Sequence, residues 1–102
     1  MPAPHVKLSA DKVREICRRY HARKLWLFGS VLREDFRPDS DIDMLVEFEP
    51  GHRVGLNIVK MERELSEIAG GRKVDLRTPA ELSRYFRDDV LREALVQYSE
   101  AG

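Results

Sequence analysis

Three aspartates, Asp41, Asp43 and Asp75, have the type and spacing that point most directly to chemistry in this chain. Asp41 and Asp43 lie two positions apart in the segment 41–48, whose alternating apolar residues predict a strand. Side chains two positions apart on a strand project from the same face, with Cα atoms roughly 6.5 Å apart. Two carboxylates this close repel each other, and a divalent cation removes that repulsion. The pair therefore suits Mg²⁺, which prefers carboxylate oxygens and keeps positions open for substrate phosphates.

Asp75 can complete such a site from a second strand. Val74 and Leu76 flank it in the short apolar segment 73–77, so we expect Asp75 to point away from the face that they occupy. If this strand lies beside 41–48, a third carboxylate can ligate one metal ion and accept the proton of an attacking hydroxyl. Two ions about 3.5–4 Å apart would bracket a phosphoryl group. In the alternative interpretation, all three aspartates are solvated charges on strand surfaces.

The pair Gly29-Ser30 precedes Asp41 by ten intervening residues and suits the phosphate end of the site. Glycine lets the backbone turn sharply near an anion, and backbone N–H groups that open a helix favour negative charge. The Ser30 hydroxyl can donate to a phosphate oxygen, and Arg33 and Ser40 are further candidate donors. Taken alone, Gly-Ser is an ordinary turn, Ser40 is equally a turn or capping residue, and Arg33 is a solvated or salt-bridged arginine.

The elements that must position these residues alternate between helix and strand. Short apolar runs predict strands at 24–28, 41–48 and 73–77. Helical spacing and capping signals predict helices at about 10–22, 30–34, 56–69, 79–86 and 88–98. This order predicts an α/β (α+β) fold, in which a small mixed β-sheet of about three or more strands is flanked by helices.

Length and charge narrow the function classes. The 102 residues fit a single domain, 1–102, in which 1–8 is expected to be a flexible tail. The 18 basic residues balance the 18 acidic ones, so nothing predicts general attraction to nucleic acid or to an anionic membrane. The apolar runs are far shorter than a membrane span, and the start of the chain lacks a signal-peptide core. With the single Cys17, this predicts a cytoplasmic protein.

Gly29-Ser30, ten intervening residues and Asp41-Ile42-Asp43 resemble the signature of the polymerase-beta-like nucleotidyltransferase superfamily. The wider order is LWLFGS, an arginine, SDIDMLVEF, a helix and KVDLRTP. It is similar, more narrowly, to the minimal nucleotidyltransferases (MNT proteins), small antitoxins encoded beside HEPN-domain toxins. This resemblance covers roughly residues 10–98 and implies the small nucleotidyltransferase core as the fold.

The resemblance also implies roles for individual residues. The metal-binding and catalytic residues that it implies are Asp41, Asp43 and Asp75, with Mg²⁺ as the cofactor. The nucleotide-binding residues are Gly29 and Ser30, with Arg33 and Ser40 as additional candidates. The implied activity is transfer of AMP from ATP to a hydroxyl, expected to be a tyrosine, of a partner HEPN ribonuclease toxin, which silences the toxin. Glu34 departs from the pattern, because many relatives have glycine after the arginine, and it adds negative charge near the expected triphosphate.

Two other hypotheses remain open. Glu34 and the small size of the chain favour a catalytically weak or inactive antitoxin that neutralises its partner by direct contact. A polymerase or tRNA-type nucleotidyltransferase would act on nucleic acid instead. Relatives of that kind carry additional domains for template or tRNA, and this neutral chain has no counterpart for them. A nucleic acid acceptor is therefore not expected unless the partner supplies it.

Overall fold

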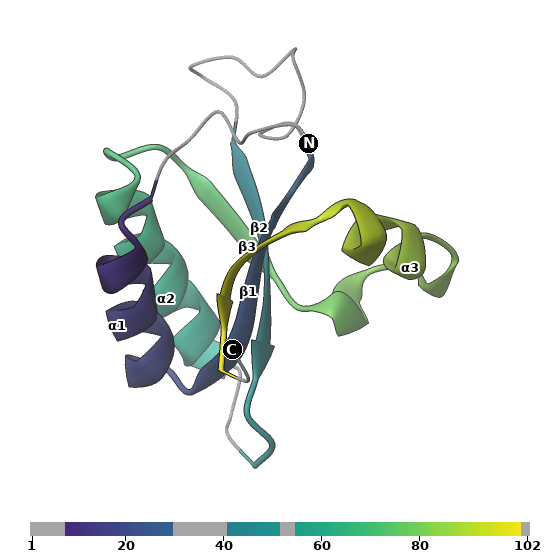
Figure 1. Cartoon of the computed structure of the whole chain (residues 1–102), viewed down its shortest axis with the longest axis horizontal. Helices are drawn as coiled ribbons and strands as arrows, with labels where there is room; N and C mark the ends of the chain where they lie inside the picture. Colours follow the sequence, from purple (N-terminus) through teal and green to yellow (C-terminus); the bar gives the residue numbers. More distant parts are fainter. Residues whose placement is uncertain (1–7, 30–40, 52–54, 101–102) are drawn as a thin grey trace.

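A computed structural model of the chain describes residues 8–29, 41–51 and 55–100. The elements are α1 (Ala10–Arg19), β1 (Ala22–Phe28), β2 (Ile42–Phe48), α2 (Gly55–Ile68), β3 (Val74–Arg77), the 3₁₀ helix η2 (Pro79–Glu81), α3 (Arg84–Glu93) and β4 (Leu95–Ser99). Figure 1 shows a twisted sheet with α1 and α2 packed side by side against one face and α3 on the other side. No helix within the described ranges is long and apolar enough to cross a membrane.

The sheet is mixed, as the sequence predicted, and its strand order is β3-β2-β1-β4. β1 pairs antiparallel with both β2 and β4, whereas β2 and β3 are parallel and are joined by the α2 crossover. Since β1 runs opposite to β2 and β3, the end of β1 meets the beginnings of β2 and β3 at one edge of the layer. Gly29, Asp43 and Asp75 all lie at this end.

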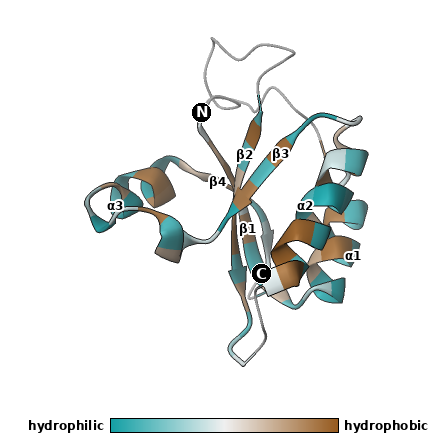
Figure 2. Cartoon of the chain, turned by 180° about the vertical axis from the view of Figure 1, so that it is seen from behind, coloured by the Kyte–Doolittle hydropathy of each residue, from teal (hydrophilic) through white to brown (hydrophobic). Residues whose placement is uncertain are grey.

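The core lies between the sheet and the α1–α2 layer. Ser9 caps α1 by accepting a hydrogen bond from the Lys12 N–H, and Leu8 packs against the core, while residues 1–7 of the expected tail lie outside the described part. The fully buried side chains of this core include Val13, Cys17, Leu25, Leu27, Ile42, Met44, Val46, Met61 and Leu65. Figure 2 shows the hydrophobic stretches of the strands and the mixed character of the two helices. Burial of alternate β2 residues leaves Asp43 on the opposite face.

The last element among the described residues is a strand, so the predicted helix over 88–98 is right only as far as residue 93 and is wrong from residue 95 onward. α3 stops at Glu93, the next residue is extended, and β4 pairs with β1. The apolar residues of this segment match a helical spacing, but β1 would otherwise leave a row of backbone hydrogen-bonding groups without strand partners. Val96 and Tyr98 are residue types that suit strands, and Tyr98 packs against the core from this position.

Two helix boundaries also differ from the prediction. α1 ends at Arg19 instead of about residue 22, because His21 adopts a left-handed φ of 60° and redirects the chain into β1. The Thr78 capping box is present, with the Glu81 carboxylate accepting from the Thr78 N–H at 3.0 Å. It opens only the single turn of η2, and a second N-cap, Ser83, begins α3. The short helix expected at 30–34 lies outside the described residues.

Candidate active site

Two of the predicted carboxylates, Asp43 and Asp75, are neighbours at the end of the sheet where β1 finishes, and Asp41 stands just before β2 at the same end. Asp43 pairs in register with Phe28 of β1 on one side and with Asp75 of β3 on the other. Neighbouring strands lie about 4.8 Å apart, so Asp43 and Asp75 project from the same face as direct neighbours. This confirms the expectation that the 73–77 strand lies beside the 41–48 strand.

Asp41 stands immediately before β2 and is anchored by the first pairing of β2 with the chain leading into β3. The Ile42 N–H donates to the Lys73 carbonyl at 2.9 Å. The Lys73 ammonium nitrogen lies 3.8 Å from Asp41 Oδ2, and both side chains are substantially exposed. Exposed pairs of this kind contribute roughly 0–1 kcal/mol, so Lys73 lessens the local negative charge without locking Asp41 in place.

Position 29 requires glycine because its backbone passes close to the Asp43 side chain. Its φ of +77° lies in the left-handed region, and a Cβ at this position would lie 2.5 Å from Asp43 Oδ2. Any side chain would therefore occupy the position of a carboxylate oxygen. The sequence predicted a glycine that brings the backbone close to an anion, and the anion beside it in the structure is Asp43.

Arg77 is a residue of this site that the sequence analysis missed. Its Nη2 donates to Asp75 Oδ2 at 3.1 Å and its Nε to Oδ1 at 3.4 Å, so one guanidinium engages both carboxylate oxygens. The hydrogen bond and the charge of Asp75 raise the pKa of Arg77, and the charge of Asp43 adds a smaller effect in the same direction. The signal was present in the sequence, because Arg77 is two positions from Asp75 on the same strand.

Helix α2 holds β3, and with it Asp75, by two side-chain contacts to backbone. Glu62 Oε2 accepts from the Leu76 N–H at 2.8 Å, and the Ser66 hydroxyl donates to the Arg72 carbonyl at 2.5 Å. β3 is an edge strand of the sheet, so its outward backbone groups have no strand to pair with. Glu62 supplies an acceptor to one of them, a role that periodicity alone does not reveal.

The donor chemistry of Asp41 and Asp43 fits Mg²⁺. Two carboxylates sit at i and i+2 on one face, and Mg²⁺ is usually held by one or two carboxylates together with substrate phosphates. Among the described residues, no three Asp, Glu, His or Cys side chains are already grouped closely enough to hold a metal ion. Asp75 forms an ion pair with Arg77 instead, which fits the absence of such a group from the described ranges. The predicted nucleotide-binding residues Ser30, Arg33 and Ser40, and also Glu34, lie outside the described part of the chain.

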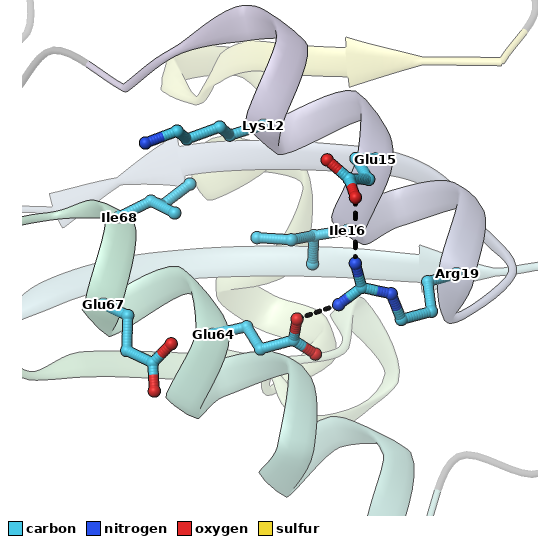
Figure 3. A pocket seen from close by; sticks show the side chains of 7 residues that line it. All are labelled: Lys12, Glu15, Ile16, Arg19, Glu64, Glu67 and Ile68. Carbon is cyan, nitrogen blue, oxygen red and sulfur yellow. Dashed lines mark hydrogen bonds and ion pairs between the residues drawn. The ribbon is translucent and has the colours of Figure 1, made fainter.

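A separate groove of about 350 Å³ lies between α1 and α2, on the helical side of the sheet (Figure 3). Arg19 bridges Glu15 of its own helix and Glu64 of α2, and the Tyr20 hydroxyl also donates to Glu64. This hydrogen bond is the main reason why the pKa of Tyr20 is raised. These contacts tie the end of α1 to α2, and they lie across the sheet from Asp43 and Asp75.

Known proteins with similar sequences are nucleotidyl-transferring enzymes by name. A family model described as "Nucleotidyltransferase domain" matches residues 10–97. The protein adenylyltransferase MntA of Thermococcus cleftensis is 35% identical over 88 residues, which cover 86% of this chain and 86% of that protein. A Methanocaldococcus jannaschii protein assigned as a protein adenylyltransferase is 33% identical over 84 residues, covering 82% of this chain and 88% of its own.

Solved structures give the same result for the fold. A chain assigned as a minimal nucleotidyltransferase matches with a TM-score of 0.71 at 36% identity, covering 84% of this chain and 86% of that one. A chain from a toxin-antitoxin structure with AMP-PNP matches with a TM-score of 0.69 at 20% identity, covering 90% of this chain and 74% of that one. At this lower identity the likeness concerns the arrangement of helices and strands alone.

Proposed function

Because the chain belongs to the nucleotidyltransferase domain family and has the polymerase-beta-like fold of its relatives, we propose that it transfers AMP from ATP to a hydroxyl group of a partner protein. The observation that carries this proposal is that Asp43 pairs in register with Asp75, while Asp41 stands immediately before the same strand, two positions from Asp43. The names of the two adenylyltransferase relatives support a protein as the acceptor.

In the proposed reaction, Asp41 and Asp43 would hold Mg²⁺ with Asp75 as the third carboxylate, and the ion would neutralise charge on the triphosphate. The acceptor oxygen bonds to the α-phosphorus of ATP, the bond from that phosphorus to the bridging oxygen breaks, and pyrophosphate leaves. Asp75 accepts the proton of the acceptor hydroxyl. Gly29 lets the backbone pass close to Asp43, and Ser30, outside the described residues, remains the predicted donor to the phosphates.

The proposed acceptor is a tyrosine of a HEPN ribonuclease toxin, which the modification neutralises. The support is that similar folds occur in solved MntA-HepT toxin-antitoxin structures. A contact surface is available on α3, where Tyr85 and Phe86 are 78% and 64% exposed. Exposed neighbouring aromatics are typical of protein interfaces. We place this activity in the cytoplasm, where ATP is available and a lone buried thiol such as Cys17 stays reduced.

The experiment is to incubate the protein with MgATP and the partner and to measure the partner's intact mass. We expect adenylyl additions with the wild type and none with Asp43→Asn, which keeps the shape of the side chain but removes its charge. Asp11→Asn is the matched control, since Asp11 is a highly exposed aspartate on α1. If the wild type binds ATP and the partner but leaves the partner's mass unchanged, the transferase proposal is wrong.

A second candidate function is neutralisation by contact alone, which the exposed Tyr85 and Phe86 favour. In that case the double variant Asp41→Asn, Asp43→Asn would neutralise the toxin as well as the wild type does. Tyr85→Ala with Phe86→Ala would lose neutralisation. Loss of neutralisation in the double aspartate variant, with partner binding retained, would exclude this candidate.

A further inference from the structure

We propose that Arg77 is a built-in counter-ion that holds Asp75 in the absence of metal and competes with metal for this carboxylate. The inference rests on the proposed function, because it takes Asp75 to be a member of the metal site. In this role Arg77 tunes the affinity of the site for metal without being a metal ligand itself. Arg77 is thus a positioning residue that acts through Asp75.

The geometry of the pair supports this role. The guanidinium engages both oxygens of Asp75, at 3.1 and 3.4 Å, in the two-pronged arrangement that arginine makes with carboxylates. Arg77 is two positions beyond Asp75 and pairs in register with Leu45, so it projects from the same face as Asp43 and Asp75. While both oxygens accept from Arg77, part of the lone-pair capacity and of the negative charge of Asp75 is already engaged, which weakens its attraction for a metal ion.

The charge pattern along β3 gives the physical reason. Lys73, Asp75 and Arg77 occupy alternate positions, so a basic, an acidic and a basic side chain follow one another along one face. Lys73 lies near Asp41, and Arg77 pairs with Asp75. Adjacent carboxylates repel each other, and these two cations offset that repulsion when no metal is present. A divalent ion does the same more strongly, so it competes with Arg77 for the same carboxylate.

The alternative role for Arg77 is direct binding of a substrate phosphate. The two roles predict opposite results for metal alone. If Arg77 competes with the metal, its removal tightens metal binding in the absence of nucleotide. If Arg77 only binds phosphate, its removal leaves the affinity for the metal alone unchanged.

The test measures binding of Mn²⁺ to the full chain without nucleotide, by the electron paramagnetic resonance signal of the free ion. We expect Arg77→Gln to bind Mn²⁺ about twofold to fivefold more tightly than wild type, because an exposed ion pair is worth up to about 1 kcal/mol. Arg92→Gln is the matched control. Arg92 also pairs with an aspartate, on α3, and its loss removes the same charge. We expect wild-type affinity from it.

A double-mutant cycle tests whether Arg77 acts through Asp75. In an Asp75→Asn background, Arg77→Gln should bring no gain in Mn²⁺ affinity. An equal gain in both backgrounds would show a long-range charge effect and overturn the inference. Unchanged or weaker Mn²⁺ binding by Arg77→Gln alone would also overturn it.

Wild-type protein that binds no Mn²⁺ would overturn both this inference and the metal-dependent function. Normal wild-type binding with no gain in the variant would overturn the inference alone. Because the Arg77 side chain is about half exposed, circular dichroism should show that the Arg77→Gln variant keeps its fold.

Discussion

Replacing Gly29 by alanine should damage the protein in two separable ways. The first is backbone strain, because φ is +77° at Gly29 and the left-handed region costs an ordinary residue roughly 1–2 kcal/mol. Gly70, at the end of α2, has a φ of +78° and should therefore carry the same strain when it is replaced by alanine. Gly70→Ala is thus a control for the conformational cost alone.

The second effect belongs to Gly29 only. Its new Cβ would lie 2.5 Å from Asp43 Oδ2 and 3.3 Å from Cγ, whereas a Cβ at Gly70 meets nothing within 4 Å. Overpacking of this kind costs about 1–3 kcal/mol unless the side chain moves away. Gly29→Ala should therefore lose about 2–5 kcal/mol in total, or else relieve the contact by displacing the Asp43 carboxylate. AMP transfer should fall in both cases.

The assays are thermal unfolding by circular dichroism and AMP transfer measured well below the melting temperature. For a domain of this size, 1 kcal/mol corresponds to roughly 4–8 °C in Tm. We expect Gly70→Ala to lower Tm by the strain term and to keep transfer activity. Gly29→Ala should lower Tm further, or match the control in Tm while losing transfer. A Gly29→Ala variant with both the Tm of the control and full transfer would refute the reasoning.

An Asp43→Ala background isolates the contact. Without the carboxylate, the nearest neighbour of the new Cβ is the Cβ of residue 43 at 3.4 Å, which is an ordinary van der Waals distance. In this background, Gly29→Ala should cost no more stability than Gly70→Ala does. An additional cost that persists would mean that the close approach to Asp43 is not its cause.

Two further predictions concern stability. Glu62→Ala removes the acceptor of a β3 backbone N–H and should lower the free energy of unfolding in denaturant by about 1–3 kcal/mol. Glu67→Ala, at an exposed position on the same helix, is the control and should cost little. Equal effects of the two substitutions would contradict the role given to Glu62. Burial raises the pKa of the Cys17 thiol to about 12, so the native protein should resist thiol reagents at pH 8 and react only when unfolded. The unfolded thiol loses its proton near its ordinary pKa of 9.0, so the contribution of Cys17 to stability is complete below about pH 9 and declines up to about pH 12. Rapid labelling of the native protein by a thiol reagent would contradict the burial of Cys17.

The parts of the site that could be predicted depend on local alternation. From Asp41 to Met44 acidic and buried apolar residues alternate, so the shared face of Asp41 and Asp43 followed from the period of a strand, although the buried Leu45 breaks the alternation one position later. The neighbouring position of Asp75 needed one assumption, that the 73–77 strand lies beside the 41–48 strand, which the tendency of sequential strands to be neighbours favours. The parallel register of β2 and β3 confirms it.

The parts that could not be predicted depend on contacts distant in sequence. The segment 95–98 satisfies helical spacing as well as strand propensity, and only pairing with β1 decides between the two. The hydrogen bond from the Leu76 N–H to Glu62 spans 14 positions and requires α2 to lie against β3. Gly29 could be identified as a point of close approach, but the atom that it approaches, on Asp43, depended on the strand register.

The strand order has a consequence for how the carboxylates are held over time. Asp43 lies on β2, which has neighbours on both sides, whereas Asp75 lies on β3, which forms an edge of the sheet. Native proteins open locally, and segments with fewer partners open at lower free energy. Backbone amides around Asp75 should therefore exchange with solvent sooner than those around Asp43. The two strands of the site should therefore differ in their protection from hydrogen exchange. Local opening of β3 would move the Asp75 carboxylate out of the site and back, while Asp43 on β2 stays in place.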